Sequence, residues 1–138
     1  MNQIPQLVDA SLCNKIVEIE NMTLSDVVAI NGPINDELLE FIIDLIEKKG
    51  KKKRTLTVLL TTNGGSAEVA ERIVFVFRRH YQEVNFYIPD HAYSAGTILS
   101  MSGDEIFMDY HSVLGSIDPQ VQNREGKFVP ALGYLDKI

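Results

Sequence analysis

The chain of 138 residues lacks tryptophan and carries a single cysteine, Cys13. One cysteine cannot form an internal disulfide, so a buried core has to hold the fold, and a reducing compartment is expected. Basic residues are also scarce, because 13 Lys and Arg face 19 Asp and Glu, for a net charge of −6. That balance argues against broad binding to nucleic acid or to an anionic membrane, since both need an electropositive surface.

Long apolar runs are absent as well. No stretch approaches the ~20 residues that cross a bilayer, and polar residues interrupt residues 1–10, which therefore do not resemble a secretory signal. We expect a cytoplasmic protein. The apolar content of 45% suits one globular domain, residues 1–138. The sequence stops without a helix cap or a polar tail, so a C-terminal truncation stays open as an alternative.

Short apolar runs alternate with amphipathic segments through the middle of the chain. Runs bounded by turn residues predict strands buried on both faces, and apolar spacings of three and four predict helices. The expected strands are residues 26–30, 56–61, 84–88 and 105–108, and the expected helices run from Asn35 or Asp36 to Gly50, from Ala67 to Arg79 and from Ser94 to Met101. This order predicts an α/β fold with a parallel sheet and right-handed crossovers.

The remaining segments are less regular. Residues 15–20 alternate in polarity, which indicates a short edge strand or an arm. A hairpin is expected over residues 121–129, and residues 131–138 are expected to open another helix. The basic cluster of residues 48–54 is interpreted as a solvated helix end, with docking of an acidic partner as the alternative.

Two loops after predicted strands carry the residues of chemical interest. In open α/β sheets, ligands bind at the carboxyl ends of strands, so we expect these loops to meet there. The first loop contains Gly64 and Gly65, which permit positive φ and a close approach of the backbone to a ligand. It lacks the Walker and dinucleotide-binding glycine patterns. The alternative interpretation is an ordinary tight turn.

The second loop places Ser94 between a strand end and a helix of small residues. At the positive end of that helix, the N–H of Ala95 would stabilise an oxyanion. Together with a backbone donor from Gly65, the loops supply the parts that acyl transfer needs apart from a base. The alternative is that Ser94 serves only as the helix N-cap.

Three motifs follow one another at fitting spacing: TTNGGSAE at 61–68, YSAGT at 93–97 and LGSIDPQ at 114–120. They resemble the serine dehydrogenase proteinase family, a branch of the Clp-protease/crotonase superfamily. The resemblance covers roughly residues 27–120 and implies a crotonase-like spiral of ββα units with a mainly parallel sheet. Ser116 stands where the family more often has proline.

The same resemblance implies an oligomeric serine peptidase. Ser94 would be its nucleophile, and the backbone N–H groups of Gly65 and Ala95, beside Gly64, would form its oxyanion hole. A general base is still needed, because a serine hydroxyl is a poor nucleophile near neutral pH.

Two residues are candidates for the base. Lys137 corresponds to the downstream lysine of the signal-peptide-peptidase relatives, but burial would have to lower its pKa by a few units from ~10.4. The ordinary pKa of His111, ~6.5, suits the task, yet His111 lies ahead of the place where a Clp-type histidine would fall. We favour Lys137. No metal or cofactor is expected, because the histidines are scattered without matching ligand spacing.

The leading interpretation is a homo-oligomeric serine endopeptidase that cleaves peptides or unfolded proteins, membrane-associated substrates included. One alternative is a crotonase-type acyl-CoA enzyme, although the sequence shows no well-placed pair of glutamates. Another is a catalytically silent oligomerisation or peptide-binding domain, with the apolar helix faces of residues 38–46 and 69–77 as subunit contacts. His80 and His91 are interpreted as a helix-end residue and as a loop residue that points away from the site.

Overall fold

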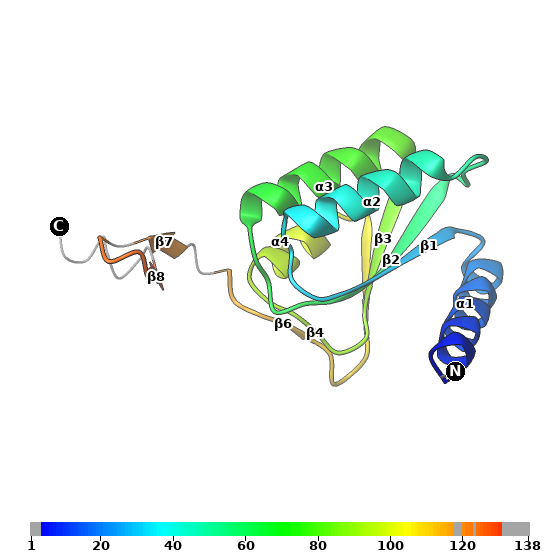
Figure 1. The fold of residues 1–138 in the computed structure, drawn as a ribbon, viewed down its shortest axis with the longest axis horizontal. Coiled ribbons are helices and arrows are strands. Elements are labelled where there is room, and N and C mark those ends of the chain that lie inside the picture. Colours follow the sequence, from blue (N-terminus) through cyan, green and yellow to red (C-terminus); the bar gives the residue numbers. More distant parts are fainter. Residues whose placement is uncertain (1–3, 118–119, 123, 131–138) are drawn as a thin grey trace.

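A computed structural model of the chain describes residues 4–117, 120–122 and 124–130. Helices and strands alternate through most of this part (Figure 1). Their bounds are α1 (Ile4–Thr23), β1 (Asp26–Asn31), α2 (Asp36–Lys48), β2 (Thr55–Thr61), α3 (Ala67–His80), β3 (Glu83–Ile88), β4 (His91–Ala92), α4 (Ala95–Met101), β5 (Glu105–Met108), β6 (Val113–Leu114), β7 (Gln120–Gln122) and β8 (Phe128–Pro130). The helix expected over residues 131–138 lies outside the described residues.

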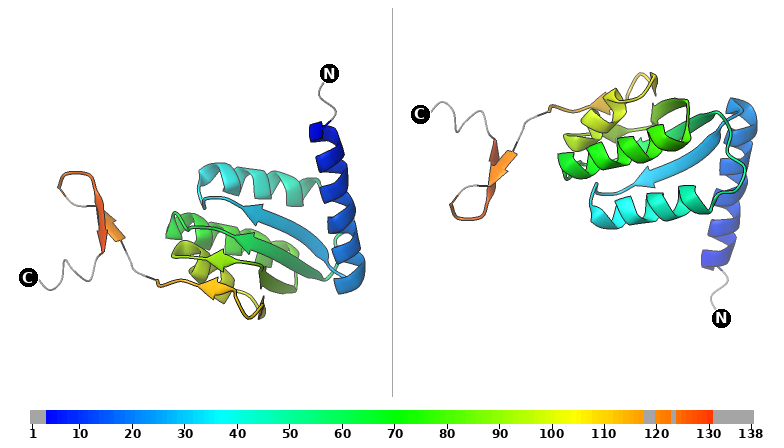
Figure 2. Two further views of the ribbon diagram at one scale, coloured as in Figure 1. Left: turned by 90° about the horizontal axis from the view of Figure 1, so that it is seen from below. Right: turned by 90° about the horizontal axis from the view of Figure 1, so that it is seen from above.

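Four parallel strands form the main sheet, in the order β1-β2-β3-β5. Helices α2 and α3 lie side by side against one face of this sheet, as Figure 2 shows from two sides. The predicted parallel α/β arrangement is therefore confirmed. Because all four strands run the same way, their carboxyl ends share one edge, and the loops that follow β2 and β3 leave from it.

The amphipathic helices bury their apolar stripes in a single core against the sheet. Asn35 starts α2 by accepting a hydrogen bond from the N–H of Leu38, and Ser66 starts α3 in the same way. The buried side chains of these helices are Leu39, Ile42, Ile46, Val69, Ala70, Ile73 and Phe77. The helix segments offered as subunit contacts thus contribute to the core, and their role in subunit contacts stays a prediction.

One sequence prediction is wrong. Residues 15–20 belong to the 20-residue helix α1 rather than to a strand or an arm. Ile16, Ile19 and Glu20 are half-buried while their neighbours are exposed, which is the spacing of a single helical stripe. Six residues of alternating polarity fit both a strand and such a stripe, so the local pattern could not separate them.

Two short pairings complete the fold. Strands β7 and β8 pair antiparallel, as expected for the hairpin. Strands β4 and β6 pair in parallel over two residues each, beside the end of β2. Strands of this length carry no periodic signal, and the sequence did not predict them.

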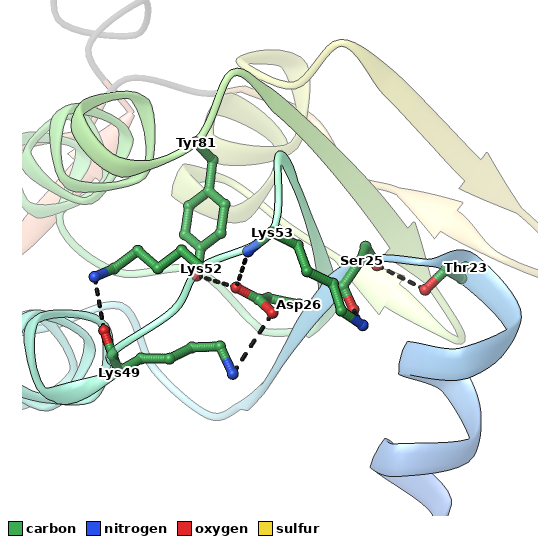
Figure 3. A network of polar contacts seen from close by, with 7 residues as sticks. All are labelled: Thr23, Ser25, Asp26, Lys49, Lys52, Lys53 and Tyr81. Carbon is green, nitrogen blue, oxygen red and sulfur yellow. Dashed lines mark hydrogen bonds and ion pairs between the residues drawn. The ribbon is translucent and has the colours of Figure 1, made fainter.

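A buried carboxylate organises the amino-terminal edge of the sheet (Figure 3). Asp26, only 3% exposed, accepts hydrogen bonds from the Tyr81 hydroxyl at 2.9 Å and from the Lys53 N–H at 3.1 Å. Its second carboxylate oxygen lies 3.5 Å from Lys49 Nζ, and Lys53 Nζ donates to the Ser25 carbonyl. Lys49 and Lys53 of the basic cluster are thereby tied to the start of β1, while every residue of 48–54 except Lys52 is exposed, as expected for a solvated helix end.

Candidate active site

Ser94 occupies the turn between β4 and α4 in an uncommon backbone conformation, with φ 51° and ψ −118°. Such a conformation costs on the order of 1–3 kcal/mol for a residue with a side chain, and the surrounding packing has to maintain it. Ser94 stands at the N-cap position of α4, but its hydroxyl makes no capping hydrogen bond. The N-cap alternative therefore does not explain this half-buried side chain.

The two glycine-containing loops meet, as expected. A β-carbon built on Gly64 would lie 2.9 Å from Ser94 Cβ and 2.9 Å from the Tyr93 carbonyl oxygen. Gly64 also has a φ of +110°, which L side chains rarely adopt. Only glycine allows the first loop to approach the Ser94 turn this closely.

The N–H of Gly65 points away from the neighbouring chain segment at Ile34. The Ile34 N–H donates to the Gly64 carbonyl at 2.9 Å, and the Ser66 N–H donates to the Ile34 carbonyl at 2.9 Å. The Gly64 carbonyl and the Gly65 N–H belong to one trans peptide group, in which C=O and N–H point in opposite directions, so the Gly65 N–H points away from Ile34. Within the described part of the chain, neither this N–H nor that of Ala95 donates to a protein acceptor. Both are available to an oxyanion.

A pocket of about 860 Å³ opens beside these donors. Its lining combines the site residues with apolar and charged side chains, among them Gly65, Ser94, Ala95, Ile34, Val69, Ile98, Ile117, Asp36, Glu68 and Arg72. The apolar side chains Ile98 and Ile117 are 36% and 46% exposed. A substrate side chain that enters here would meet apolar surface close to the Ser94 hydroxyl.

Threonine side chains brace the back of the site. Thr62 Oγ1 accepts the Gly64 N–H at 3.0 Å, and the Thr97 hydroxyl lies 3.0 Å from each of the carbonyls of Ala92 and Gly115. Thr62 and Thr97 are both buried. These contacts tie the first loop, the start of α4 and the end of β6 into one unit.

Of the two candidate bases, the structure describes only His111, which stands apart from this unit. His111 lies in the turn between β5 and β6, with its side chain half exposed and Nε2 4.0 Å from Asp109 Oδ2. It is not among the residues that line the pocket. Lys137 lies outside the described residues. The structure therefore brings together Ser94 and the backbone groups expected around it, without bringing His111 to them.

His91 is the neighbour of the site that the sequence analysis missed. It does not line the pocket itself, but its Nε2 lies 2.9 Å from Oδ1 of Asn63, a residue of the pocket lining. No local signal in the sequence places His91 against Asn63, which lies 28 residues earlier in the chain.

The fold and the site define an α/β protein with a parallel sheet and a serine next to backbone N–H groups that have no acceptor among the described residues. Residues 34–132 match the family of ClpP-like SDH-type serine proteinases, so the chain belongs to that family. It is also 33% identical to two uncharacterized proteins of Methanocaldococcus jannaschii, over 66 and 70 residues, or 48% and 51% of this chain. The matched segments make up 23% and 24% of those relatives, so the chain spans about a quarter of their length.

Solved structures show the same fold. The 1510-N membrane-bound stomatin-specific protease superimposes with a TM-score of 0.62 at 21% identity, over 80% of this chain and 56% of that one. Its complex with a substrate peptide gives 0.60 at 24% identity, over 79% and 54%. ClpP1 from Listeria monocytogenes gives 0.53 at 20% identity, over 67% and 51%. Within the described residues, none of the helices combines the length and apolar character that a membrane crossing requires.

Proposed function

We propose that this chain is a serine endopeptidase with Ser94 as its nucleophile. The observation that supports this proposal best is the packing of Gly64 against Ser94, at a turn where the N–H groups of Gly65 and Ala95 have no acceptor among the described residues. The Ser94 oxygen attacks the peptide carbonyl carbon, and the carbonyl oxygen becomes an oxyanion that accepts hydrogen bonds from both N–H groups. Collapse of this intermediate expels the protonated amine and leaves an acyl-enzyme, which water then hydrolyses.

Lys137 is the base in this proposal, with His111 as the alternative. The exposed position of His111 beside Asp109, outside the pocket, favours the lysine. So does one of the similar structures, in which a lysine of the stomatin-specific protease is replaced by alanine in the complex with a substrate peptide. A lysine base takes the Ser94 proton only when it is uncharged, which requires a pKa well below ~10.4.

The proposed substrate is a polypeptide that presents an apolar side chain. Ile98 and Ile117 in the pocket support this preference, because an apolar side chain gains most by leaving water against such a surface. Membrane-associated proteins belong to the proposed substrate range, since the similar protease is described as membrane-bound and stomatin-specific.

We also propose that the chain works as a homo-oligomer. Helices α2 and α3 keep three large apolar side chains in solvent, Phe41, Leu45 and Phe75, which are 58%, 43% and 63% exposed. Phe41 and Leu45 are four residues apart, so they share one face of α2. Light scattering after size-exclusion chromatography measures the assembly, and a wild-type monomer would contradict the proposal.

Removal of the nucleophile tests the proposed function. We expect Ser94→Ala to abolish hydrolysis of a fluorogenic apolar peptide and labelling by a fluorescent fluorophosphonate. Ser11→Ala is the matched control, because Ser11 is an exposed serine on α1. If Ser94→Ala is labelled as fast as the wild type, the assignment of the nucleophile is wrong.

Paired variants separate the two bases. We expect Lys137→Ala to lose hydrolysis by at least about 100-fold, the lower range for a general base, whereas His111→Ala keeps most of the activity. The opposite result would transfer the role to His111. Labelling by the fluorophosphonate follows the same order, since attack on phosphorus also needs the Ser94 proton to be removed.

A further inference from the structure

A cluster of polar and aromatic side chains lies next to the Gly64–Gly65 turn. The His91 cluster, as we name it, consists of Asn63, Asp90, His91 and Tyr93. His91 Nδ1 lies 2.7 Å from Asp90 Oδ2, and Nε2 lies 2.9 Å from Asn63 Oδ1. The imidazole also stacks on Tyr93, with ring centroids 4.7 Å apart and an angle of 22° between the planes. Three contacts therefore fix one ring whose side chain is 25% exposed.

Both ring nitrogens of His91 are engaged, so this histidine is not free to accept the Ser94 proton. With Nδ1–H donating to the Asp90 carboxylate, Nε2 of the neutral ring accepts, and Asn63 has to present its amide NH₂. With a charged ring, Asn63 presents its carbonyl oxygen instead. In either state the Asn63 side chain is held in place by His91.

The cluster joins the two loops of the site. Asn63 directly precedes Gly64 in the first loop, and Tyr93 directly precedes Ser94 in the second. Tyr93 is itself confined, because a β-carbon on Gly115 would strike its ring. A shift of His91 would thus displace both Asn63 and Tyr93, the residues that directly precede Gly64 and Ser94.

The glycine turn needs such support. Gly64 and Gly65 have φ values of +110° and +149°, and a glycine pair has many other accessible conformations. The backbone of Ile34 and the Thr62 hydroxyl hold the turn by hydrogen bonds, and the Thr62 backbone pairs with His91 and Tyr93, but within the described part of the chain no backbone bond holds Asn63. The hydrogen bond of His91 to Asn63 holds the residue that enters the turn, from the side of the second loop.

We propose that His91 is a positioning residue for peptide hydrolysis: by holding Asn63, it keeps the Gly64–Gly65 turn aimed so that the Gly65 N–H faces the Ser94 oxygen. This inference rests on the proposed function of the chain as a serine peptidase. Preorganised donors act only when they are correctly placed, and small misplacements at a reacting centre are costly. Loss of the support lowers turnover more than substrate binding, because the oxyanion exists only after attack.

Two substitutions separate hydrogen bonding from packing. His91→Phe keeps an aromatic ring to stack on Tyr93 but removes both polar contacts, and Asn63→Ala removes the same link from the other side. We expect each to lower kcat about tenfold, with KM within about twofold of the wild type. The double variant should be no worse than either single variant, because both break one link. His80→Phe, at the end of α3 and outside the pocket, is the control.

The following results would contradict the proposed role of His91. If His91→Phe keeps the kcat of the wild type, or if the losses of the two single variants multiply in the double variant, His91 does not act through Asn63. If KM rises while kcat stays constant, the cluster binds substrate rather than positioning the turn. Either outcome overturns the inference while leaving Ser94 as the nucleophile.

A measurement that needs no catalytic activity tests the inference even if the proposed function is wrong. In two-dimensional NMR spectra, we expect His91→Phe and Asn63→Ala to shift the amide signals of Gly64 and Gly65 in the same direction, while that of Gly103 stays in place. Unmoved glycine signals would overturn the inference. If the wild type neither hydrolyses peptides nor reacts with the fluorophosphonate, the proposed function fails, and these signals still decide whether His91 holds the turn.

Discussion

The polar groups at the two edges of the main sheet differ in how fully they are hydrogen-bonded. At the amino-terminal edge, the buried Asp26 carboxylate is surrounded by donors from Tyr81 and Lys53 (Figure 3). At the carboxyl-terminal edge, the Ser94 hydroxyl makes no capping bond, its backbone is strained, and the N–H of Gly65 has no protein acceptor within the described residues. Saturated polar contacts stabilise a fold, whereas unsatisfied groups held in place are available to a ligand.

Stability and reactivity therefore depend on opposite edges of the sheet in this chain. The Asp26 edge also contains a buried hydrogen bond of 2.7 Å between the hydroxyls of Ser25 and Thr57. The Ser94 edge is instead held by close backbone packing, in which glycine is required at position 64. Substitutions at the first edge should change the free energy of unfolding, and substitutions at the second should change activity.

Among the variants that compare the two edges, Gly64→Ala is expected to have the largest effect. The new methyl group would clash with Ser94 Cβ and the Tyr93 carbonyl at a φ of +110°. Displacement of one oxyanion donor lowers kcat by about 100-fold or more. Gly50→Ala is the matched control, because a β-carbon there meets nothing within 4 Å. A Gly64→Ala variant that retains wild-type kcat in a peptide assay would break the distinction between the two edges.

Asp26→Asn should mainly destabilise the fold. Loss of the charge weakens two hydrogen bonds and the ion pair with Lys49, and we expect the free energy of unfolding to fall by about 2 kcal/mol or more. Urea unfolding measures this fall, and peptide hydrolysis per folded molecule should stay constant. Loss of turnover at unchanged stability would show that the two edges are not independent.

Tyr81→Phe should have a smaller effect, about 1–2 kcal/mol, because it removes one donor to Asp26. Burial, and then the hydrogen bond to Asp26, raise the pKa of Tyr81 above its ordinary value of 10.0. A raised pKa contributes stability that is complete below the unfolded pKa and is lost as the pH rises. The difference between wild type and Tyr81→Phe should therefore shrink above about pH 10; a constant difference in urea unfolding would contradict this account.

The smallest effect is expected for Asp104→Asn, which lies at the amino end of β5. The Arg78 side chain, followed by the Val84 N–H, lowers the pKa of Asp104 below its ordinary value of 3.8. Such stability is present above pH 3.8 and is lost as the pH falls through the native pKa. Because the pair is exposed, we expect a loss below about 1 kcal/mol at pH 7. Unfolding at pH 7 and pH 2.5 should show this difference diminishing; equal differences would contradict the assignment.

Most of the fold could be predicted because its signals are local. The apolar spacing of α2, its cap at Asn35 and the apolar run of β2 each lie within one short window. The segment over residues 15–20 failed because its pattern fits two structures. The β4–β6 pairing could not be predicted, because two residues per strand are too few to show an alternation of apolar and polar side chains.

The candidate site divides in the same way. Gly64, Gly65 and Ser94 could be selected from loop chemistry and motif order, before any contact between them was known. The bond from His91 to Asn63 and the burial of Asp26 depend on residues that are 28 and 55 positions from their partners, Asn63 and Tyr81. No local pattern contains such contacts. The choice between Lys137 and His111 stays a prediction for the same reason.

The most direct test of the account is a crystal structure of the protein after reaction with a peptide fluorophosphonate. We predict a covalent bond from Ser94 Oγ to phosphorus, with one phosphonyl oxygen about 2.7–3.1 Å from both the Gly65 and the Ala95 nitrogen atoms. An adduct whose oxygens point into solvent, or one formed at a residue other than Ser94, would contradict it.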